Sequence, residues 1–393
     1  MVYVDPMIKK NTMKRILLLL ALLLPAAAGA QVLSDGAKAS VLTCGAGEDF
    51  YTSFGHSAIR ITDPVKGLDL VYNYGTFDFG TPHFYWKFMR GQLDYQLSRT
   101  SYAEFIDEYE WYSRPVSEQR LTFESGQVQN LFLLLETNYL PEYRHYRYDF
   151  LRDNCATRVR DIVYSAWAQD TVLQRTAEPR SYRQLLATCL KDSMEWWHLG
   201  IDLLFGLPTD HRCSAPERMF LPAEMEAELA QCTTTGIWTA PAIVEPSHAL
   251  LTKGRTPLKA SFPPVVAFAL LLAVIAVLTV CAHRFSFKPV VFNVIDRVLF
   301  IVAGLCGLFL CFMWFCTDHW CTQWNLNILW LSPLLILIAI RLGRSPRWAL
   351  WLQEAMFFVA AVWVVWCGLS VAIIPLIIML MLRVAVLLFR AKC

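Results

Sequence analysis

The amino-acid sequence predicts an exported α+β domain followed by an all-α transmembrane bundle of five helices. Three observations support this: an apolar N-terminal run, a central region of ordinary soluble composition, and a C-terminal third built from long apolar runs. Hydrophobic residues make up 55% of the 393 residues and charged residues 17%, whereas soluble domains carry about 25% charge. The net charge of +2 lacks the basic excess of nucleic-acid-binding proteins, so we expect no nucleic-acid partner.

Residues 1–30 have the pattern of a secretory signal peptide. Two basic residues precede the apolar run 16–24, and residues 28–30 form a small-x-small cleavage site. The apolar run is too short to favour a membrane span instead. The sequence therefore predicts that residues 31–240 are exported, and that the proline-rich segment 241–263 links this domain to the membrane.

The transmembrane domain is predicted to occupy residues 264–393. Basic residues fall between the first and second spans, between the third and fourth, and in the C-terminal tail, which lie on one side of a five-span bundle. The positive-inside rule then places the soluble domain outside the cytoplasm and the C-terminus in the cytoplasm. Arg383 lies near the end of the last span, where its side chain is expected to reach the membrane surface. The five spans are predicted near 264–283, 297–316, 326–340, 349–367 and 369–389.

Within the exported domain the patterns favour helices near 101–112, 126–139 and 176–198, and a strand near 117–123. This domain contains five cysteines, an odd number, so at least one thiol is free or pairs outside it. Their spacing resembles no zinc site, and we expect neither a metal nor a cofactor. The five are Cys44, Cys155, Cys189, Cys213 and Cys232.

Cys155 is the candidate nucleophile. It follows Asp153 and Asn154, which are good N-cap residues, and precedes apolar residues at helical spacing. A thiol in the first turn of a helix meets unpaired amides and the positive end of the helix dipole, which favour the nucleophilic thiolate. The alternative is a buried structural cysteine at a helix start.

His56 is the candidate base. It begins a strand-like run that is entered through Gly55. Asn73, near the end of the next strand-like run, could reach and orient the imidazole across two antiparallel strands, with Asp78 as a weaker substitute. The alternatives are a hydrogen-bonded structural histidine and a turn asparagine.

The order of a strand histidine, a polar residue on the next strand and an Asn-Cys helix start resembles the circularly permuted papain-like (NlpC/P60) thiol enzymes, including the lecithin:retinol acyltransferase-like branch. The chain more closely resembles the Lnb-type lipoprotein N-acyltransferase family. The motifs that carry this resemblance are Phe54-Gly55-His56-Ser57-Ala58-Ile59-Arg60, Asn73-Tyr74-Gly75-Thr76-Phe77-Asp78-Phe79, Phe88-Met89-Arg90-Gly91, Asp153-Asn154-Cys155-Ala156-Thr157-Arg158, Asp318-His319 and Asn325-Leu326-Asn327.

The resemblance implies a papain-like exported domain and an enzyme that moves an acyl chain from a phospholipid, through a cysteine thioester, to a diacylated lipoprotein. It also implies the inner membrane of a Gram-negative envelope, with the catalytic domain in the periplasm. It implies Cys155 and His56 as catalytic residues, with Asn73 as the third, although related proteins often have histidine at that position. The residues expected to support the site or bind substrate are Asn154, Arg158, Asp78, His319, Asn325 and Asn327.

Residues 84–90 combine aromatic rings with Lys87 and Arg90, a mixture suited to the depth of lipid headgroups. An ordinary core helix is the alternative. Two other functions also stay open for the chain. One is a membrane-tethered cell-wall peptidase or amidase that uses the same cysteine and histidine, and the other is a non-enzymatic envelope module in which Cys155 forms a disulfide.

Overall fold

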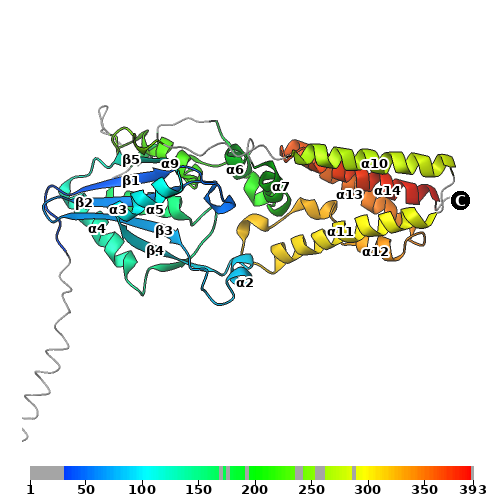
Figure 1. Ribbon diagram of the computed structural model, residues 1–393, viewed down its shortest axis with the longest axis horizontal. Coiled ribbons are helices and arrows are strands. Elements are labelled where there is room, and N and C mark those ends of the chain that lie inside the picture. The colour runs from blue at the N-terminus through cyan, green and yellow to red at the C-terminus, as the bar shows by residue number, and fades with distance from the viewer. Residues whose placement is uncertain are drawn as a thin grey trace, which may run out of the picture.

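The computed structural model describes residues 31–167, 171–173, 178–190, 194–234, 242–252, 262–285 and 289–390. The predicted signal peptide lies outside these residues. Figure 1 shows a domain with a β-sheet at one end of the molecule and a bundle of long helices at the other. The fold prediction is confirmed at this level, since a sheet-containing domain precedes five apolar helices.

The larger sheet has seven antiparallel strands in the order β6-β4-β3-β2-β1-β5-β9. Its middle strands alternate between two buried faces. Val41, Ile59 and Tyr72 point to one face, and Leu42 and Ala58 to the other. The strands are β1 (Lys38–Cys44), β2 (His56–Asp63), β3 (Leu68–Thr76), β4 (Asp94–Ser101), β5 (Val116–Arg120), β6 (His145–Arg147) and β9 (His248–Leu251).

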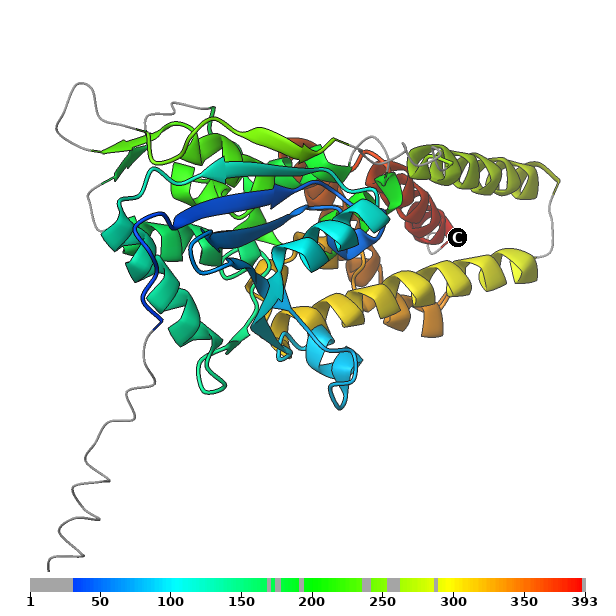
Figure 2. The same ribbon diagram turned by 60° about the vertical axis from the view of Figure 1, so that its left-hand side comes forward.

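Helices cover both faces of this sheet (Figure 2). The first face packs against α4 (Ser125–Tyr139) and α5 (Cys155–Trp167) in one large apolar cluster. The second face packs against α3 (Tyr102–Trp111) through Phe105 and Tyr109. Because both faces of the sheet are buried, its strand ends are the places where side chains from the strands and from a helix start can meet.

The remaining elements of this domain connect the sheet to the bundle. The segment predicted as one helix over 176–198 contains α6 and the start of α7, with residues 191–193 outside the described part. The predicted linker 241–263 includes β9, which pairs with β5 at the sheet edge. These elements are η1 (Phe50–Thr52), α2 (Phe84–Met89), β7 (Thr171–Leu173), α6 (Tyr182–Leu190), α7 (Glu195–Leu204), η2 (Leu207–Asp210), α8 (Ala215–Arg218), α9 (Pro222–Leu229) and β8 (Cys232–Thr234).

In the described part of the chain, five helices are long and apolar enough to cross a membrane, as predicted. Four of the spans lie in α10 (Pro264–Phe285), α11 (Pro289–Phe315), α13 (Arg347–Trp366) and α14 (Ile373–Arg390). The third, Trp320–Ile340, begins with the 3₁₀ turns η3 (Trp320–Thr322) and η4 (Leu326–Leu329) and ends in α12 (Leu334–Ile340).

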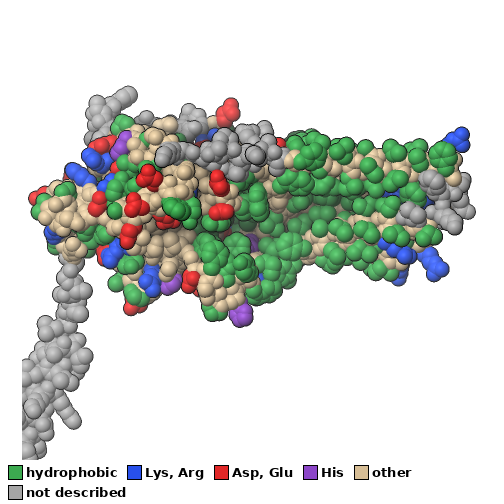
Figure 3. Space-filling view, viewed as in Figure 1, with side chains coloured by type: hydrophobic (Ala, Val, Ile, Leu, Met, Phe, Trp, Pro, Cys, Tyr) green, Lys and Arg blue, Asp and Glu red, His purple; other side chains and the backbone are tan. Residues whose placement is uncertain are grey.

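The surface of the bundle matches the environment of a membrane protein. Figure 3 shows hydrophobic side chains covering the visible face of the bundle, with Lys and Arg side chains at the end far from the sheet. Exposed basic residues in the connections and the last helix account for this end: Arg284, Arg341, Arg344, Arg347 and Arg390.

The prediction that Arg383 reaches the membrane surface is wrong. Its side chain is fully buried inside the bundle, where Nε and Nη2 donate to the Asp296 carboxylate at 2.6 and 3.1 Å. Nη1 donates to the Thr279 hydroxyl at 2.6 Å. The guanidinium therefore joins α10, α11 and α14, because a buried charge is tolerated in an apolar environment only when it is paired.

We predict that Asp296→Ala lowers the free energy of unfolding by about 3–5 kcal/mol, because it leaves the Arg383 cation buried and unpaired. Unfolding by SDS titration in mixed micelles measures the loss. The double variant Asp296→Leu/Arg383→Leu is the control and should lose less than Asp296→Ala alone. A loss below about 1 kcal/mol for Asp296→Ala would contradict a buried pair.

Candidate functional site

Cys155 is the first residue of α5, as the sequence predicted. Asn154 caps this helix start. Its side-chain Oδ1 accepts from the Thr157 backbone amide at 3.0 Å, and its own backbone amide donates to the Thr157 hydroxyl at 2.8 Å. The side-chain Nδ2 of Asn154 donates to the carbonyls of Phe150 and Phe220 at 2.8 and 2.9 Å. Asn154 is therefore a cap that fixes the position of the thiol.

The Cys155 thiol is buried against the end of the sheet. Burial raises its pKa, and the backbone amides of Ser57, Ala156 and Cys155 itself oppose this by stabilising the thiolate. The same amides are the kind of donors that stabilise an oxyanion formed beside the sulfur. In the resting state the group is a neutral thiol next to a set of donors for negative charge.

Gly75 makes room for this thiol. Its φ is +86°, and a Cβ added there would lie 3.5 Å from the Cys155 Cβ and 3.4 Å from a ring carbon of Tyr148. The left-handed backbone conformation at this position favours glycine, and an added Cβ would touch both Cys155 and Tyr148.

His56 and Asn73 form the pair that the sequence predicted. His56 Nε2 lies 3.3 Å from Asn73 Oδ1. Because the amide oxygen can only accept, Nε2 carries the proton and Nδ1 keeps its lone pair. Burial is the main cause that lowers the pKa of His56 to about 4, and the positive charge of Arg114 is the second. The hydrogen bond to Asn73 acts in the opposite direction and raises this pKa. The imidazole is thus a neutral base at neutral pH. In the described part of the chain it has no hydrogen bond to the Cys155 sulfur, although Ser57, the next residue, lies beside that sulfur.

Arg114, which no sequence pattern marks as a site residue, carries a charge that acts on both Cys155 and His56. The Nε and Nη2 atoms of Arg114 donate to the Gly45 carbonyl at 3.0 and 2.9 Å. Gly45 follows Cys44, and Cys44 on β1 pairs with His56 on β2. The cation favours the thiolate of Cys155 and disfavours the imidazolium of His56. Arg114 belongs to no motif, and only the pairing of β1 with β2 and β5 brings it here.

Tyr146 and Tyr148 both lie beside Gly75, next to the Cys155 Cβ. Tyr146 Oη and the Cys155 Cβ both lie within 4 Å of the point where a Gly75 side chain would begin. The Tyr146 hydroxyl is buried and has no hydrogen-bond partner among the described residues, a state that costs about 1–3 kcal/mol. A substrate oxygen near the sulfur would satisfy it.

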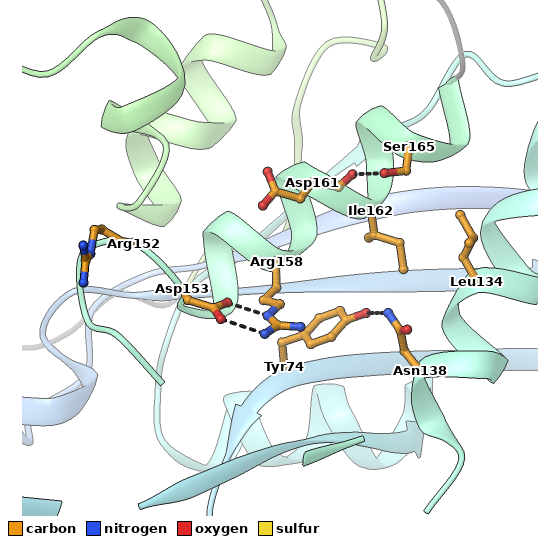
Figure 4. Close-up of a pocket in the computed structure, with 9 residues that line it drawn as sticks. All are labelled: Tyr74, Leu134, Asn138, Arg152, Asp153, Arg158, Asp161, Ile162 and Ser165. Atoms are coloured by element: carbon orange, nitrogen blue, oxygen red, sulfur yellow. Dashed lines mark hydrogen bonds and ion pairs between the residues drawn. The ribbon is translucent and has the colours of Figure 1, made fainter. Parts of the chain in front are cut away.

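Arg158 lies one turn along α5 and does not face the thiol. Its Nη2 donates to Asp153 at 2.7 Å, and its guanidinium lies 4.0 Å from the centre of the Tyr146 ring. Figure 4 shows both charged groups in a pocket that also contains Tyr74 and Asn138, which are hydrogen-bonded to each other. Cys155 does not line this pocket.

Other predicted site residues lie elsewhere. Asp78 is exposed and accepts from the Gly80 amide in a turn. Asn325 donates to the carbonyls of Leu203 and Leu204, and Asn327 to that of Asp202, so both cap the end of α7.

His319 lies at the junction of the two domains, where its Nε2 donates to the Phe88 carbonyl at 3.0 Å. Within the described residues, no group of three or more His, Cys, Asp or Glu side chains could hold a metal ion.

Comparison with known proteins identifies the two parts of the chain. The Lnb N-terminal periplasmic domain matches residues 26–188 and the Lnb transmembrane domain matches residues 256–392. The chain belongs to the Lnb family. It is an inner-membrane protein with a periplasmic N-terminal domain, as predicted. No curated protein and no solved structure matches it.

We predict that Arg114→Gln slows the alkylation of Cys155 by about two- to tenfold near neutral pH, because loss of the cation raises the thiol pKa and lowers the thiolate fraction. The same change raises the pKa of His56, so the acid limb of the pH–rate profile moves upward from about 4. Iodoacetamide labelling followed by peptide mass spectrometry measures the rate. Arg120→Gln, an exposed cation on β5, is the control, and equal rates for both variants would exclude this role for Arg114.

We predict that Gly75→Ala slows Cys155 labelling, whereas Gly67→Ala does not. Both glycines have positive φ, at +86° and +64°, so both variants should lose a similar amount of stability, about 1 kcal/mol. Only at Gly75 does the new methyl group touch Cys155 and fill space beside it, because nothing lies within 4 Å of a Cβ at Gly67. Thermal unfolding and labelling rates separate the two effects. Equal labelling of the two variants would show that the space beside Gly75 does not matter.

Proposed function

We propose that this Lnb-family protein is a lipoprotein N-acyltransferase. It would move an acyl chain from a membrane phospholipid to Cys155 and then to the α-amine of a diacylglyceryl-cysteine lipoprotein. The observation that carries the proposal is the buried Cys155 thiol at a helix start, beside the strand that begins with the neutral, Asn73-bonded His56, in a domain fixed to a transmembrane bundle. Family membership and the membrane location of both substrates support it.

In the first step Nδ1 of His56 takes the proton from Cys155 as the sulfur attacks the ester carbonyl of the phospholipid. The amides of Ser57, Ala156 and Cys155 stabilise the oxyanion that forms. The C–O ester bond then breaks, and the lysophospholipid leaves with the proton from His56. The acyl group stays on Cys155 as a thioester.

In the second step the lipoprotein amine attacks the thioester carbonyl and gives a proton to His56. The C–S bond breaks, the amide forms, and the sulfur regains its proton from His56. Because Cys155 is a neutral thiol and His56 a neutral imidazole at rest, the thiolate forms during the attack and not before it. Ping-pong kinetics follow from the covalent intermediate.

The order of a strand histidine, a strand asparagine and a helix-start cysteine favours a papain-like arrangement of the site, and we propose this relation for the periplasmic domain. Every cysteine in the described part of the chain is a free thiol, Cys155 included, which supports an enzyme over a disulfide-linked module. The basic far end of the bundle supports a cytoplasmic C-terminus.

We predict that Cys155→Ser abolishes N-acylation, because serine lacks the acidity and nucleophilicity that the weak base His56 can exploit. The measurement is mass spectrometry of a lipoprotein N-terminus from cells that lack other acylating enzymes and express the variant. Cys189→Ser, which removes a thiol on α6, is the matched control and should acylate normally. Full acylation by Cys155→Ser would refute the thioester mechanism.

A further inference from the structure

Three aromatic side chains on α2 are exposed to the surroundings of the domain. Tyr85 is 79% exposed, Trp86 51% and Phe88 53%, although the opposite side of this short helix buries Phe84. Lys87 and Arg90 lie among these rings, and neither forms an ion pair with another described residue. Exposed rings beside unpaired cations are typical of proteins at the headgroup level of a bilayer.

The end of a membrane span fixes α2 in this position. The Trp86 ring lies 6.0 Å from the Phe312 ring on α11, three residues before that span ends. The Asp318 amide donates to the Arg90 carbonyl at 2.9 Å, and Gln92 donates to the Asp318 carboxylate at 3.0 Å. Figure 1 shows α2 next to the sheet-facing end of α11. The exposed rings therefore lie where the bilayer surface meets the protein.

The buried side of α2 leads toward the catalytic thiol. Phe84 packs against Phe77 at 5.7 Å between ring centres, and Phe77 against Tyr95 at 5.3 Å. Tyr95 stacks on Tyr148 at 4.2 Å. Tyr148 lies beside Gly75, next to the Cys155 Cβ. A continuous row of rings thus connects the bilayer surface to the site.

We propose that α2 and this row of rings, the aromatic path, line the route by which the acyl chain of a membrane phospholipid reaches Cys155. The role of the path as the route of the acyl donor rests on the proposed function, but the contact between α2 and lipid does not require turnover. The exposed rings give an acyl chain apolar contacts at the bilayer surface, and Lys87 and Arg90 face its phosphate group. The occupant is a phospholipid, because the path begins at lipid depth, where Lys87 and Arg90 are available to a phosphate group.

A photocrosslinking experiment tests the contact. The photoreactive residue p-benzoylphenylalanine replaces Tyr85, and in a second variant Phe88, in the full chain carrying Cys155→Ser, reconstituted in nanodiscs of phosphatidylethanolamine and phosphatidylglycerol without lipoprotein. We expect phospholipid adducts on the α2 peptide by mass spectrometry. Tyr143, 63% exposed on the α4–β6 connection, is the matched control position and should give at least tenfold less adduct. Adducts at neither α2 position above the Tyr143 level would overturn the proposal.

An activity experiment tests the path. In the active protein, Tyr85→Ser/Trp86→Ser should slow Cys155 acylation by vesicle phospholipid about tenfold, since both rings lose their apolar contact with the donor's acyl chain. Acylation by a soluble short-chain thioester should be unchanged, because that donor needs no bilayer surface. The proposed path would be overturned if the variant slowed acylation equally with both donors, or if it slowed acylation with neither donor. The crosslinks are read in a protein without its nucleophile, so failure of the N-acylation mechanism leaves them unaffected, and the two failures are distinguishable.

Discussion

A single buried carboxylate joins the two parts of this protein. Asp202, on the last turns of α7, is fully buried, and its Oδ1 accepts from Arg183 of α6 at 3.0 Å. Its Oδ2 accepts from the Ser370 amide in the connection between α13 and α14 at 2.7 Å and lies 3.3 Å from His198. Its backbone carbonyl accepts from Asn327. A charge buried between two domains is stable only with all these donors in place, so the junction has one geometry.

That geometry places the site relative to the lipid. The thiol position follows from the sheet, through the cap that Asn154 makes on α5, while the height of the sheet above the bundle follows from the junction. The contacts of α2 with the loop at Asp318 form a second attachment at the other side. A single attachment would allow the domain to rotate about the membrane normal, whereas two attachments resist this rotation. A catalytic domain on a flexible linker would have to find its lipid substrates by diffusion at each step.

Much of this arrangement could be predicted from the sequence, because its signals are local. Apolar runs of fixed length predict spans, and Asn154 before Cys155 predicts a helix start, as the structure has it. The hydrogen bond of His56 to Asn73 followed from two consecutive strands, although its catalytic role stays a prediction. Arg114 could not be found in this way, since its charge reaches the site through strand pairing alone. The burial of Arg383 was also out of reach, because its partner Asp296 lies on a different helix and no local pattern links them.

The same physical chemistry bears on how a reactive thiol persists in the periplasm, an oxidising compartment where cysteines tend to form disulfides. The thiolate, not the thiol, is the form that oxidants and other disulfides attack. Burial raises the pKa of Cys155 and keeps it protonated, while His56, with a pKa of about 4, does not form a stable ion pair with it. Nearby Cys44 is protected in the same way, since burial raises its pKa to about 12. The amides at the start of α5 oppose this effect of burial but do not cancel it, since the pKa of the Cys155 thiol stays raised. On the proposed function, such an enzyme would give up some resting nucleophilicity for a thiol that stays reduced until a lipid substrate arrives.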